Sequence, residues 1–302
     1  MTSFLERHQV AFYLLAIAAG LAFSGLALGW LEYPALALLL FATFMAIPLE
    51  KVRPHWRYLR ASLALNFLGV PLIVAVLTLF LNDLEVKTAV VMVLLAPCID
   101  YVVVFTRLAG GNVAAIATST PFLFLVQMAV IPVALHFVIG GGDVPFPVAP
   151  MLQAFIGLIV IPFGLAWAVQ QTRAKEKISK VTDDWMVPVM CLTLFVIATV
   201  HSPGLGENLP RLIPALVCYV LFIFAAVGLA LALGRALNFQ RQDRIALMLT
   251  TMTRNSLVIM PFALALPEGF SFVPVAIIMQ TVVELVALSA VVKIARLPAA
   301  KH

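Results

Sequence analysis

Charged residues are scarce in this sequence. Asp, Glu, Lys and Arg together make up 11% of its 302 residues, and 63% of the chain is hydrophobic. Soluble domains carry about 25% charged residues. This shortage excludes a soluble globular domain and predicts an all-α polytopic protein of the cell membrane, with the lipid bilayer as its surroundings. The formal net charge of +5 does not indicate a nucleic-acid partner, because the basic residues fall in short loops between apolar segments.

Cysteine and the common catalytic motifs are scarce as well. Cys98, Cys191 and Cys218 all lie within apolar runs and form no C-x-x-C, so the sequence predicts neither a disulfide framework nor a metal site. It contains no G-x-S-x-G, no H-E-x-x-H and no phosphate loop G-x-x-x-x-G-K-[ST]. We therefore expect no enzyme and no cofactor, and we expect an ion gradient or the membrane potential, rather than ATP, to power any transport.

Long apolar runs are what the sequence has in abundance. A membrane-crossing helix needs about 20 apolar residues, and short loops between such runs make neighbouring helices antiparallel. The first run is expected to be a retained helix rather than a signal peptide, because it is too long for a signal-peptide core and many spans follow it. The ten predicted spans are 10–28, 34–49, 59–81, 87–106, 113–138, 149–170, 184–200, 210–234, 244–265 and 271–294.

The distribution of Lys and Arg predicts the orientation of these spans. Of the 19 Lys and Arg residues, all except Lys87, Arg211 and Arg254 fall on the side that carries both termini. Cytoplasmic loops are enriched in Lys and Arg, so both termini are predicted to be cytoplasmic. The opposite side carries acidic residues instead, namely Glu32, Asp83, Glu85, Asp143, Glu207 and Glu268.

The spans divide into two sets of five, and the second set is predicted to be inverted relative to the first because five is an odd number. Pro121 and Gln127 lie six residues apart in the fifth span, and Pro274 and Gln280 lie six residues apart in the tenth. The offset between the two pairs is the same, which indicates an internal repeat. The predicted repeats are residues 1–142 and 143–302.

Polar residues interrupt one span in each repeat. Pro97 removes a backbone donor and clashes with the preceding turn, and Asp100 costs roughly 2.5–3.5 kcal/mol at the centre of a membrane helix. The offset that relates the repeats carries this stretch onto the polar run 250–256. We therefore predict broken helices in spans four and nine that cross near the bilayer midplane and form a binding site. The candidate substrate-binding residues are Cys98, Asp100, Thr251, Thr253, Arg254 and Asn255.

Other polar residues are candidates for ion coupling. Asp100 and Arg254 have opposite charges at matching depth, and an ion pair between them is either part of the site or purely structural. Glu284 lies four residues after Gln280 and so on the same helical face, where it could carry a proton or pair with a basic residue. Gln127 either lines the same cavity or only bonds between helices. The coupling candidates are Asp100, Gln127, Gln280 and Glu284.

Cys98 allows two interpretations from its chemistry alone. A buried cysteine is usually a small hydrophobic residue, an interpretation that fits Cys191 and Cys218. Cys98 differs because it lies beside Pro97 and near Asp100. A thiol is a soft ligand that suits thiophilic substrates.

The predicted spans and two short motifs together resemble a known family. Ten spans, breaks in spans four and nine, and the stretch Leu108–Ala114 are similar to the bile acid/sodium symporter superfamily. Within it, Ala96-Pro97-Cys98 followed without gaps by Leu108-Ala109-x-Gly111 resembles the arsenite efflux permeases, with Asn112 where those have Asp. The resemblance implies a core domain of spans 3–5 and 8–10 and a panel domain of spans 1–2 and 6–7, with the site between them.

The resemblance also implies roles for single residues. Cys98 matches an essential cysteine of the arsenite permeases, whereas their essential glutamate in span nine corresponds to Leu257 and does not carry over. The sodium-ligating positions of the bile acid branch hold Val102, Val103, Ile116 and Thr250 here, and only Thr120 is kept. Coupling to protons, or uniport, is therefore favoured over sodium.

Three hypotheses follow from the sequence. The first is efflux of arsenite or a related trivalent metalloid in exchange for protons, with a sulfur contact from Cys98. The second is transport of a small organic anion that Arg254 and helix N-termini bind. The third is an intramembrane enzyme or sensor that uses Cys98 and Asp100, which is disfavoured because no catalytic base is evident.

Overall fold

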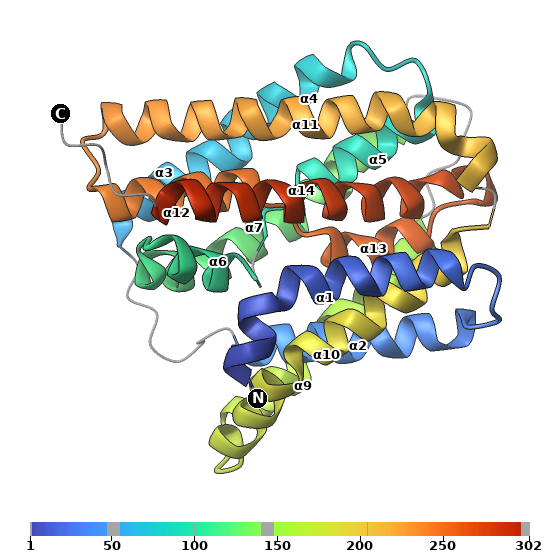
Figure 1. Cartoon of the computed structure of the whole chain (residues 1–302), viewed down its shortest axis with the longest axis horizontal. Helices are drawn as coiled ribbons and strands as arrows, with labels where there is room; N and C mark the ends of the chain where they lie inside the picture. The colour runs from blue at the N-terminus through green and yellow to red at the C-terminus, as the bar shows by residue number, and fades with distance from the viewer. Residues whose placement is uncertain (1, 47–54, 99–100, 140–147, 204, 297–302) are drawn as a thin grey trace.

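The computed structural model describes residues 2–46, 55–98, 101–139, 148–203 and 205–296, and within these residues the chain is all-helical. Successive long helices run in alternating directions (Figure 1). The N-terminal half contains α1 (Thr2–Ala22), α2 (Gly29–Ala46), α3 (Trp56–Ala64), the π-helical turn η1 (Leu65–Gly69), α4 (Val70–Thr78), α5 (Leu84–Leu94), α6 (Val102–Ala109) and α7 (Val113–Ile139). The C-terminal half contains α8 (Val148–Phe155), the π-helical turn η2 (Ile156–Val160), α9 (Ile161–Gln170), α10 (Lys175–His201), α11 (Leu205–Ala236), α12 (Arg241–Met252), α13 (Ser256–Leu264), the 3-10 turn η3 (Glu268–Phe270) and α14 (Phe272–Arg296).

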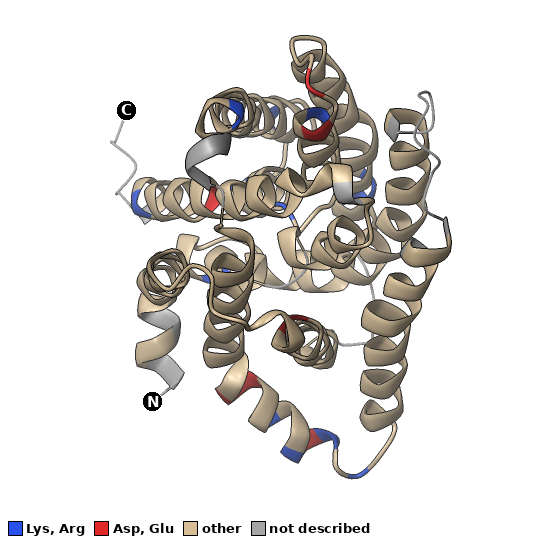
Figure 2. Cartoon of the chain, turned by 90° about the vertical axis from the view of Figure 1, so that its right-hand side faces the viewer, with Lys and Arg blue, Asp and Glu red and all other residues tan. Residues whose placement is uncertain are grey.

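The chain is a multi-pass membrane protein. Within the described residues, seven helical segments are long and apolar enough to cross a membrane, and His8–Ala22 forms a shorter apolar helix. Charged residues are sparse along these helices, except in the first turns of α10 (Figure 2). The seven segments are Gly29–Ala46, Trp56–Thr78, Val113–Val138, Leu152–Gln170, Lys175–His201, Leu209–Ala236 and Phe272–Ala295.

The fourth and ninth predicted spans are each divided into two short helices. Helices α5 and α6 have 11 and 8 residues, and α12 and α13 have 12 and 9 residues. A helix of this length covers less than the roughly 30 Å of a bilayer core. Neither half crosses the membrane alone, so these segments differ from the seven continuous ones.

Two helices depart furthest from the predicted spans. The first helix begins at Thr2 and ends at Ala22 rather than covering 10–28, because Gly25 takes a left-handed conformation with φ 88° and turns the chain although the sequence stays apolar. Helix α10 begins at Lys175 rather than at 184. Its first turns are charged, and hydropathy alone cannot detect a helix that continues beyond the apolar layer.

The helices form two groups. Helices α1, α2, α9 and α10 contact one another and occupy the lower half of Figure 1. We name these four helices, together with α8, which leads into α9 through η2, the first helix group. The second helix group consists of α3 to α7 and α11 to α14, in which α14 contacts both α5 and α11. Contacts of α13 with α2 and α8 join the two groups.

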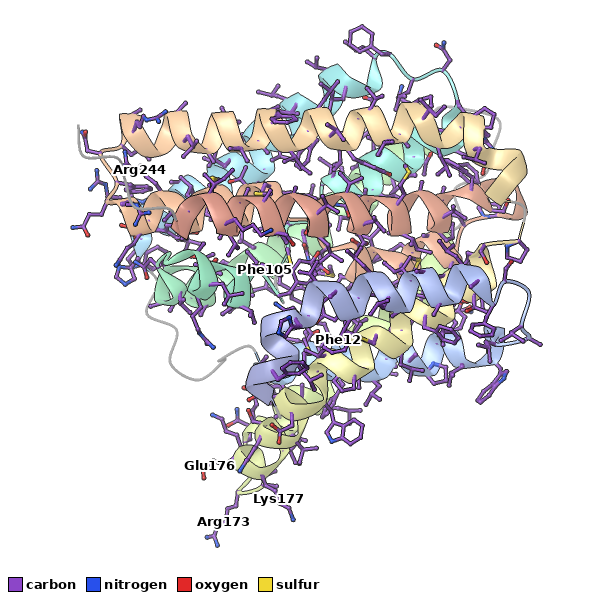
Figure 3. The ribbon with its side chains drawn as sticks, in the orientation of Figure 1. Phe12, Phe105, Arg173, Glu176, Lys177 and Arg244 are labelled. Atoms are coloured by element: carbon purple, nitrogen blue, oxygen red, sulfur yellow. The ribbon has the colours of Figure 1, made fainter. Side chains whose placement is uncertain are left out.

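Basic side chains gather at one end of the molecule. Figure 3 places Arg244 at the left of the view and Arg173 and Lys177 at its lower left, close to where α9 ends and α10 begins. We name this the basic end. The N-termini of α5 and α14 lie at the other end, where Asp83 and Glu85 contact Arg211.

The turn between α6 and α7 fixes α6 against α12. Gly110 ends α6 in the left-handed region with φ 72°. A Cβ on Gly111 would lie 2.7 Å from the Thr106 side chain and 2.9 Å from that of Ile245, so only glycine allows this close packing. The main chain of Asn112 then donates to Gln242 O at 3.0 Å. The second broken helix is thereby tied to the first.

Candidate functional site

The two helix breaks meet at the centre of the second helix group. Helix α5 ends at Leu94 because Pro97 cannot donate a main-chain bond and disfavours helix in the residue before it. Helix α12 ends at Met252, and α13 begins at Ser256. Pro97 and Arg254 form an antiparallel bridge, in which Cys98 N donates to Thr253 O at 3.2 Å and Asn255 N donates to Ala96 O at 2.8 Å. These bonds satisfy main-chain groups that the breaks leave without helical partners.

Glu284 lies buried beside this crossing and contacts both breaks. Its Oε1 accepts from the Tyr101 hydroxyl at 2.6 Å, and its Oε2 accepts from the main-chain N of Arg254 at 2.7 Å. Gln280 Nε2, one turn earlier on α14, donates to Oε2 at 2.6 Å. Three donors thus converge on one carboxylate and form a connected network.

The network continues through hydroxyl groups on α13 and α14. Ser256 Oγ donates to Gln280 Oε1 at 2.9 Å, and Thr281 Oγ1 donates to Ser256 Oγ at the same distance. Ser256, Gln280 and Thr281 are all buried. The orientation of the Gln280 amide is therefore fixed from both sides, which directs its NH2 group towards Glu284.

Arg254 is the largest fully buried side chain of the described residues, and three of its four partners are carbonyl oxygens at helix ends. Its guanidinium donates to Leu94 O at 3.2 Å, to Thr250 O at 3.3 Å, to Thr251 O and to Asn66 Oδ1 at 2.9 Å. The Phe222 ring covers the guanidinium, with 5.1 Å between Cζ and the ring centroid. The sequence also predicted an ion pair between Arg254 and Asp100, and Asp100 lies outside the described residues.

The other predicted substrate residues have different environments. The hydroxyl groups of Thr251 and Thr253 donate to main-chain oxygens of their own helix, Leu247 O and Leu249 O, at 2.7 Å. Asn255 Oδ1 accepts from Val258 N at 3.2 Å and so caps α13. Its Nδ2 has no partner among the described residues. The two threonines thus serve the helix, while the Asn255 amide retains donors for a ligand.

Cys98 lies in the crossing and is 1% exposed. The other two cysteines, Cys191 on α10 and Cys218 on α11, lie on other helices. Only Cys98 of the three lies in the crossing, where its main-chain N donates to Thr253 O.

Gln127 is buried on α7, and neither of its amide atoms has a hydrogen-bond partner in the described structure. Leaving a buried polar group unpaired costs about 1–3 kcal/mol per group. Gln280, its predicted counterpart in the second repeat, is fully engaged with Glu284 and Ser256. The two glutamines therefore occupy different environments, and Gln127 remains available for a ligand or water.

A cavity of about 460 Å³ opens between the two helix groups towards the basic end. Tyr101 and Arg107 form part of its wall on the second helix group, and Lys175 and Asp183 lie on the wall from α10. Because the Tyr101 hydroxyl reaches Glu284, this wall connects the cavity directly to the buried carboxylate. Its remaining lining consists of Gln9, Tyr13, Met45, Ala46, Val103, Val104, Ala117, Thr120, Gln170, Ser179, Met186, Val187 and Met190.

A second cavity, of about 980 Å³, lies between the same two helix groups at the opposite end. It is lined by residues of α2, of α8 and η2, and by Leu264 at the end of α13 and the three residues that follow it. Phe44, Phe124 and Phe163 pack between the two cavities, with ring centroids 5.1–6.0 Å apart. Along α2, Phe44 lies between Ala37, which lines the larger cavity, and Met45, which lines the smaller one. Phe163 lies in the same way between Leu158 and Gln170.

Tyr101 is the functional candidate that the sequence analysis did not select. It follows Asp100 directly, but a tyrosine in an apolar helix is ordinary, and its contact with Glu284 spans 183 positions of the chain. Only the position of Tyr101, immediately after a helix break, could have marked it.

The comparison with known families agrees with the architecture. Residues 33–207, more than half of the chain, match the model of the Sodium Bile acid symporter family. A search of curated proteins finds no match.

Proposed function

The chain belongs to the Sodium Bile acid symporter family, and from this premise we propose that it is a proton-coupled secondary transporter of a small organic anion. The observation that carries the proposal is the contact between Tyr101 in the cavity wall and the buried Glu284. A substrate in the cavity and a proton on Glu284 would both act on this one hydroxyl.

The architecture behind the proposal is ten spans in two inverted repeats, 1–142 and 143–302. Each of the pairs α5–α6 and α12–α13 counts as one broken span. The second helix group corresponds to the core domain and the first to the panel domain. The basic end is cytoplasmic by the Lys and Arg distribution, which puts both termini in the cytoplasm.

The cavity at the basic end supports an anionic substrate with apolar parts. Arg107 and Lys175 provide two positive charges at the wall against one negative charge from Asp183. Methionines 45, 186 and 190 add adaptable apolar surface. A volume of about 460 Å³ is within the range of small-molecule sites.

Coupling to protons is supported by the surroundings of Glu284. Tyr101, Gln280 and the main-chain N of Arg254 donate to its two oxygens, and the Arg254 guanidinium and Cys98 belong to the adjoining crossing. A proton on Oε1 would compete with the Tyr101 hydroxyl for the same oxygen. Tyr101 would then reorient in the cavity wall, which links protonation to substrate binding.

Arsenite efflux in exchange for protons is the second candidate function, and Cys98 is the observation that favours it. Its thiol lies in the crossing beside Arg254, where a soft ligand could contact a trivalent metalloid. Because Cys98 is 1% exposed, this function requires the crossing to open towards a cavity during transport.

Transport by proteoliposomes tests the first function. We expect uptake of a labelled bile acid to follow an imposed pH gradient and to lose that dependence in Glu284→Gln, because glutamine keeps the side-chain shape but carries no proton. Glu32→Gln, which alters a carboxylate that contacts His201 at 2.6 Å far from the crossing, is the matched control. Uptake driven by sodium alone would contradict the proposal.

Growth of an arsenite-hypersensitive bacterium tests the second function. Protection by the wild type that Cys98→Ser abolishes, and that Cys218→Ser leaves intact, would establish arsenite export through the Cys98 thiol. Equal protection by all three would exclude the thiol contact, and no protection by the wild type would exclude arsenite export.

A further inference from the structure

We infer that the guanidinium of Arg254 is a built-in cation that takes the place of a coupling sodium ion where the two broken helices cross. The inference rests on the proposed transport function and deepens it, because it explains how a sodium symporter fold can operate without sodium. It concerns the guanidinium group and the oxygens around it, and not Glu284.

The partners of the guanidinium are the kind of oxygen atoms that bind a monovalent cation. They comprise three main-chain carbonyl oxygens, from Leu94, Thr250 and Thr251, and the side-chain oxygen of Asn66. All four are neutral, and no carboxylate bonds to the guanidinium among the described residues. Carbonyl oxygens from several segments converging on one positive group form a cation site whose cation is covalently attached.

The positions of these oxygens explain why a cation is needed there. Leu94 is the last residue of α5, and Thr250 and Thr251 lie in the last turn of α12. The last four carbonyl groups of a helix lack internal partners, and the C-terminus carries a partial negative charge. Two such helix ends converge at this point within a membrane protein, where water cannot replace the missing donors. In transporters with broken helices, Na⁺ binds to such carbonyl ends.

Asn66 reaches this site from a third element. It lies in η1, the π-helical turn between α3 and α4, and its Nδ2 donates to Ser62 O at 2.9 Å. This bond orients the Asn66 Oδ1 towards Arg254, at 2.9 Å from Nη2. π-Helical turns are common at functional sites, and this one provides an acceptor whose only role in the described structure is to bind the guanidinium.

Arginine is suited to act as a permanent ion. Its guanidinium stays charged in proteins, and its planar group directs several donors at once. The side chain of Arg254 is 0% exposed, and Phe222 covers it. The main chain of Arg254 is also held in the bridge with Pro97. The positive charge therefore cannot leave with the substrate. Because the guanidinium occupies these oxygens, a sodium ion cannot bind to them, and a sodium gradient cannot drive transport through this site.

Thermal unfolding of the purified full-length protein in detergent tests the inference without substrate or transport. For the wild type we expect the same Tm in NaCl and in KCl of equal ionic strength. For Arg254→Ala, which leaves the four oxygens around a void, we expect a lower Tm in KCl. Sodium or millimolar guanidinium should then raise it by about 2–4 °C when present at several times its Kd.

Arg241→Ala is the matched control. Arg241 also donates to a main-chain oxygen, Ala295 O at 2.7 Å, but it is exposed and lies away from the crossing. The Tm of the Arg241→Ala protein should respond to neither sodium nor guanidinium.

Arg254→Lys keeps a charge but offers one ammonium group to four separated oxygens, so we expect a lowered Tm without a sodium response.

Two results would overturn the inference. The first is a Tm of the wild type or of Arg254→Lys that rises in sodium but not in potassium. The second is folded Arg254→Ala that responds to neither sodium nor guanidinium. If Arg254→Ala does not fold, the wild type and Arg254→Lys still decide. Because no transport is measured, a failure of the proposed substrate or proton coupling leaves this result unaffected, and the reverse also holds.

Discussion

At the scale of single residues, the centre of the molecule holds two charges with separate partners. The sequence suggested an ion pair of Arg254 with Asp100, and either a proton or a basic partner for Glu284. The guanidinium of Arg254 bonds to helix ends, whereas the carboxylate of Glu284 bonds to Tyr101, Gln280 and the Arg254 main chain. Each charge thus has its own set of partners. Protonation of Glu284 can therefore change the Tyr101 contact while the bonds of the guanidinium remain in place.

Tyr101→Phe tests the link between the cavity and Glu284. Removing the hydroxyl takes one donor from the carboxylate, which then holds its proton more tightly. We expect the pH dependence of transport to move upward by about 1 pH unit, because a hydrogen bond to a charged group contributes about 1.5–3 kcal/mol and one pH unit corresponds to about 1.4 kcal/mol. The measurement is transport by proteoliposomes across a pH series.

Tyr13→Phe is the control for Tyr101→Phe, since Tyr13 lines the same cavity from α1 on the other helix group. It should leave the pH profile in place. If the pH dependence of transport by Tyr101→Phe is identical to that of the wild type, the Tyr101 hydroxyl takes no part in proton coupling.

Gln127→Leu tests whether the unpaired amide serves function rather than folding. Leucine removes two buried groups that lack partners, so we expect the Tm to stay the same or rise while transport falls at least about tenfold, as for one lost polar contact with a substrate. Differential scanning fluorimetry and transport assays measure the two effects. A lower Tm with unchanged transport would instead assign Gln127 a structural role.

At the scale of secondary-structure elements, tethers at both ends of the broken helices hold them in place. At the basic end, Asn112 Oδ1 accepts from Ala115 N at 3.0 Å and so caps α7, while its Nδ2 donates to Asp243 Oδ1 on α12 at 2.7 Å. An Asp at position 112 could cap α7 but could not donate to Asp243. The asparagine is thus matched to Asp243.

Asn112→Asp should destabilise the protein by about 1–3 kcal/mol, because the bond to Asp243 is lost and two carboxylates then face each other. The exchanged pair Asn112→Asp with Asp243→Asn restores one donor and one acceptor and should recover most of the wild-type Tm. Both are measured by thermal unfolding. An exchanged pair no more stable than Asn112→Asp would show that the two side chains do not act together.

At the opposite end, Asp83 caps α5 through Glu85 N and Val86 N and contacts Arg211 of α11 at 2.7 Å. The hydrogen bond from Arg211 lowers the pKa of Asp83 below its usual value. A lowered pKa means that Asp83 contributes stability above its unfolded pKa of about 3.9, and that this contribution is lost as the pH falls through the folded value.

Asp83→Asn should therefore lower the Tm at neutral pH and not in acid. The pair is partly exposed, so the expected loss is only about 0.5–1 kcal/mol. Unfolding of both proteins between neutral pH and pH of about 3 provides the measurement, and a constant difference across that range would exclude the ionic contribution.

The elements also show how far the sequence could predict this structure. Pro97 and the polar run 250–256 are local features, and α5 and α12 end beside them. The spacing of Gln280 and Glu284 predicted one shared face, and the two side chains do bond. The partners of Arg254 could not be predicted, because three of them are main-chain carbonyl groups that every residue has. The role of Tyr101 depends on a contact between distant elements in the same way.

At the scale of the whole molecule, two cavities between the same two helix groups open towards opposite ends. This arrangement fits alternating access, in which one group moves against the other and exposes a central site to each side in turn. Glu284 and Arg254 belong to the second group, so they would move with it as a unit. The first group would supply the opposite wall, including Lys175 and Asp183.

The aromatic cluster of Phe44, Phe124 and Phe163 is one contact between the two groups that would open and close in such a cycle. Phe44 and Phe163 belong to the first group and Phe124 to the second. Phe124 follows the cavity residue Thr120 by one turn of α7, and all three rings pack edge-on or stacked at 5.1–6.0 Å. Their ring contacts are worth about 0.5–1.5 kcal/mol per pair.

Phe124→Leu should therefore weaken the seal without emptying the core, and we expect proteoliposomes with this variant to leak protons when substrate is absent. Phe122→Leu is the matched control, because Phe122 lies on the same helix but packs on Trp56. The measurement is the decay of an imposed pH gradient, followed with an enclosed dye. Faster decay for Phe124→Leu alone would place the seal at these rings, since the substitution connects the two cavities. Equal decay for both variants and the wild type would mean that the seal lies elsewhere along the boundary between the two helix groups.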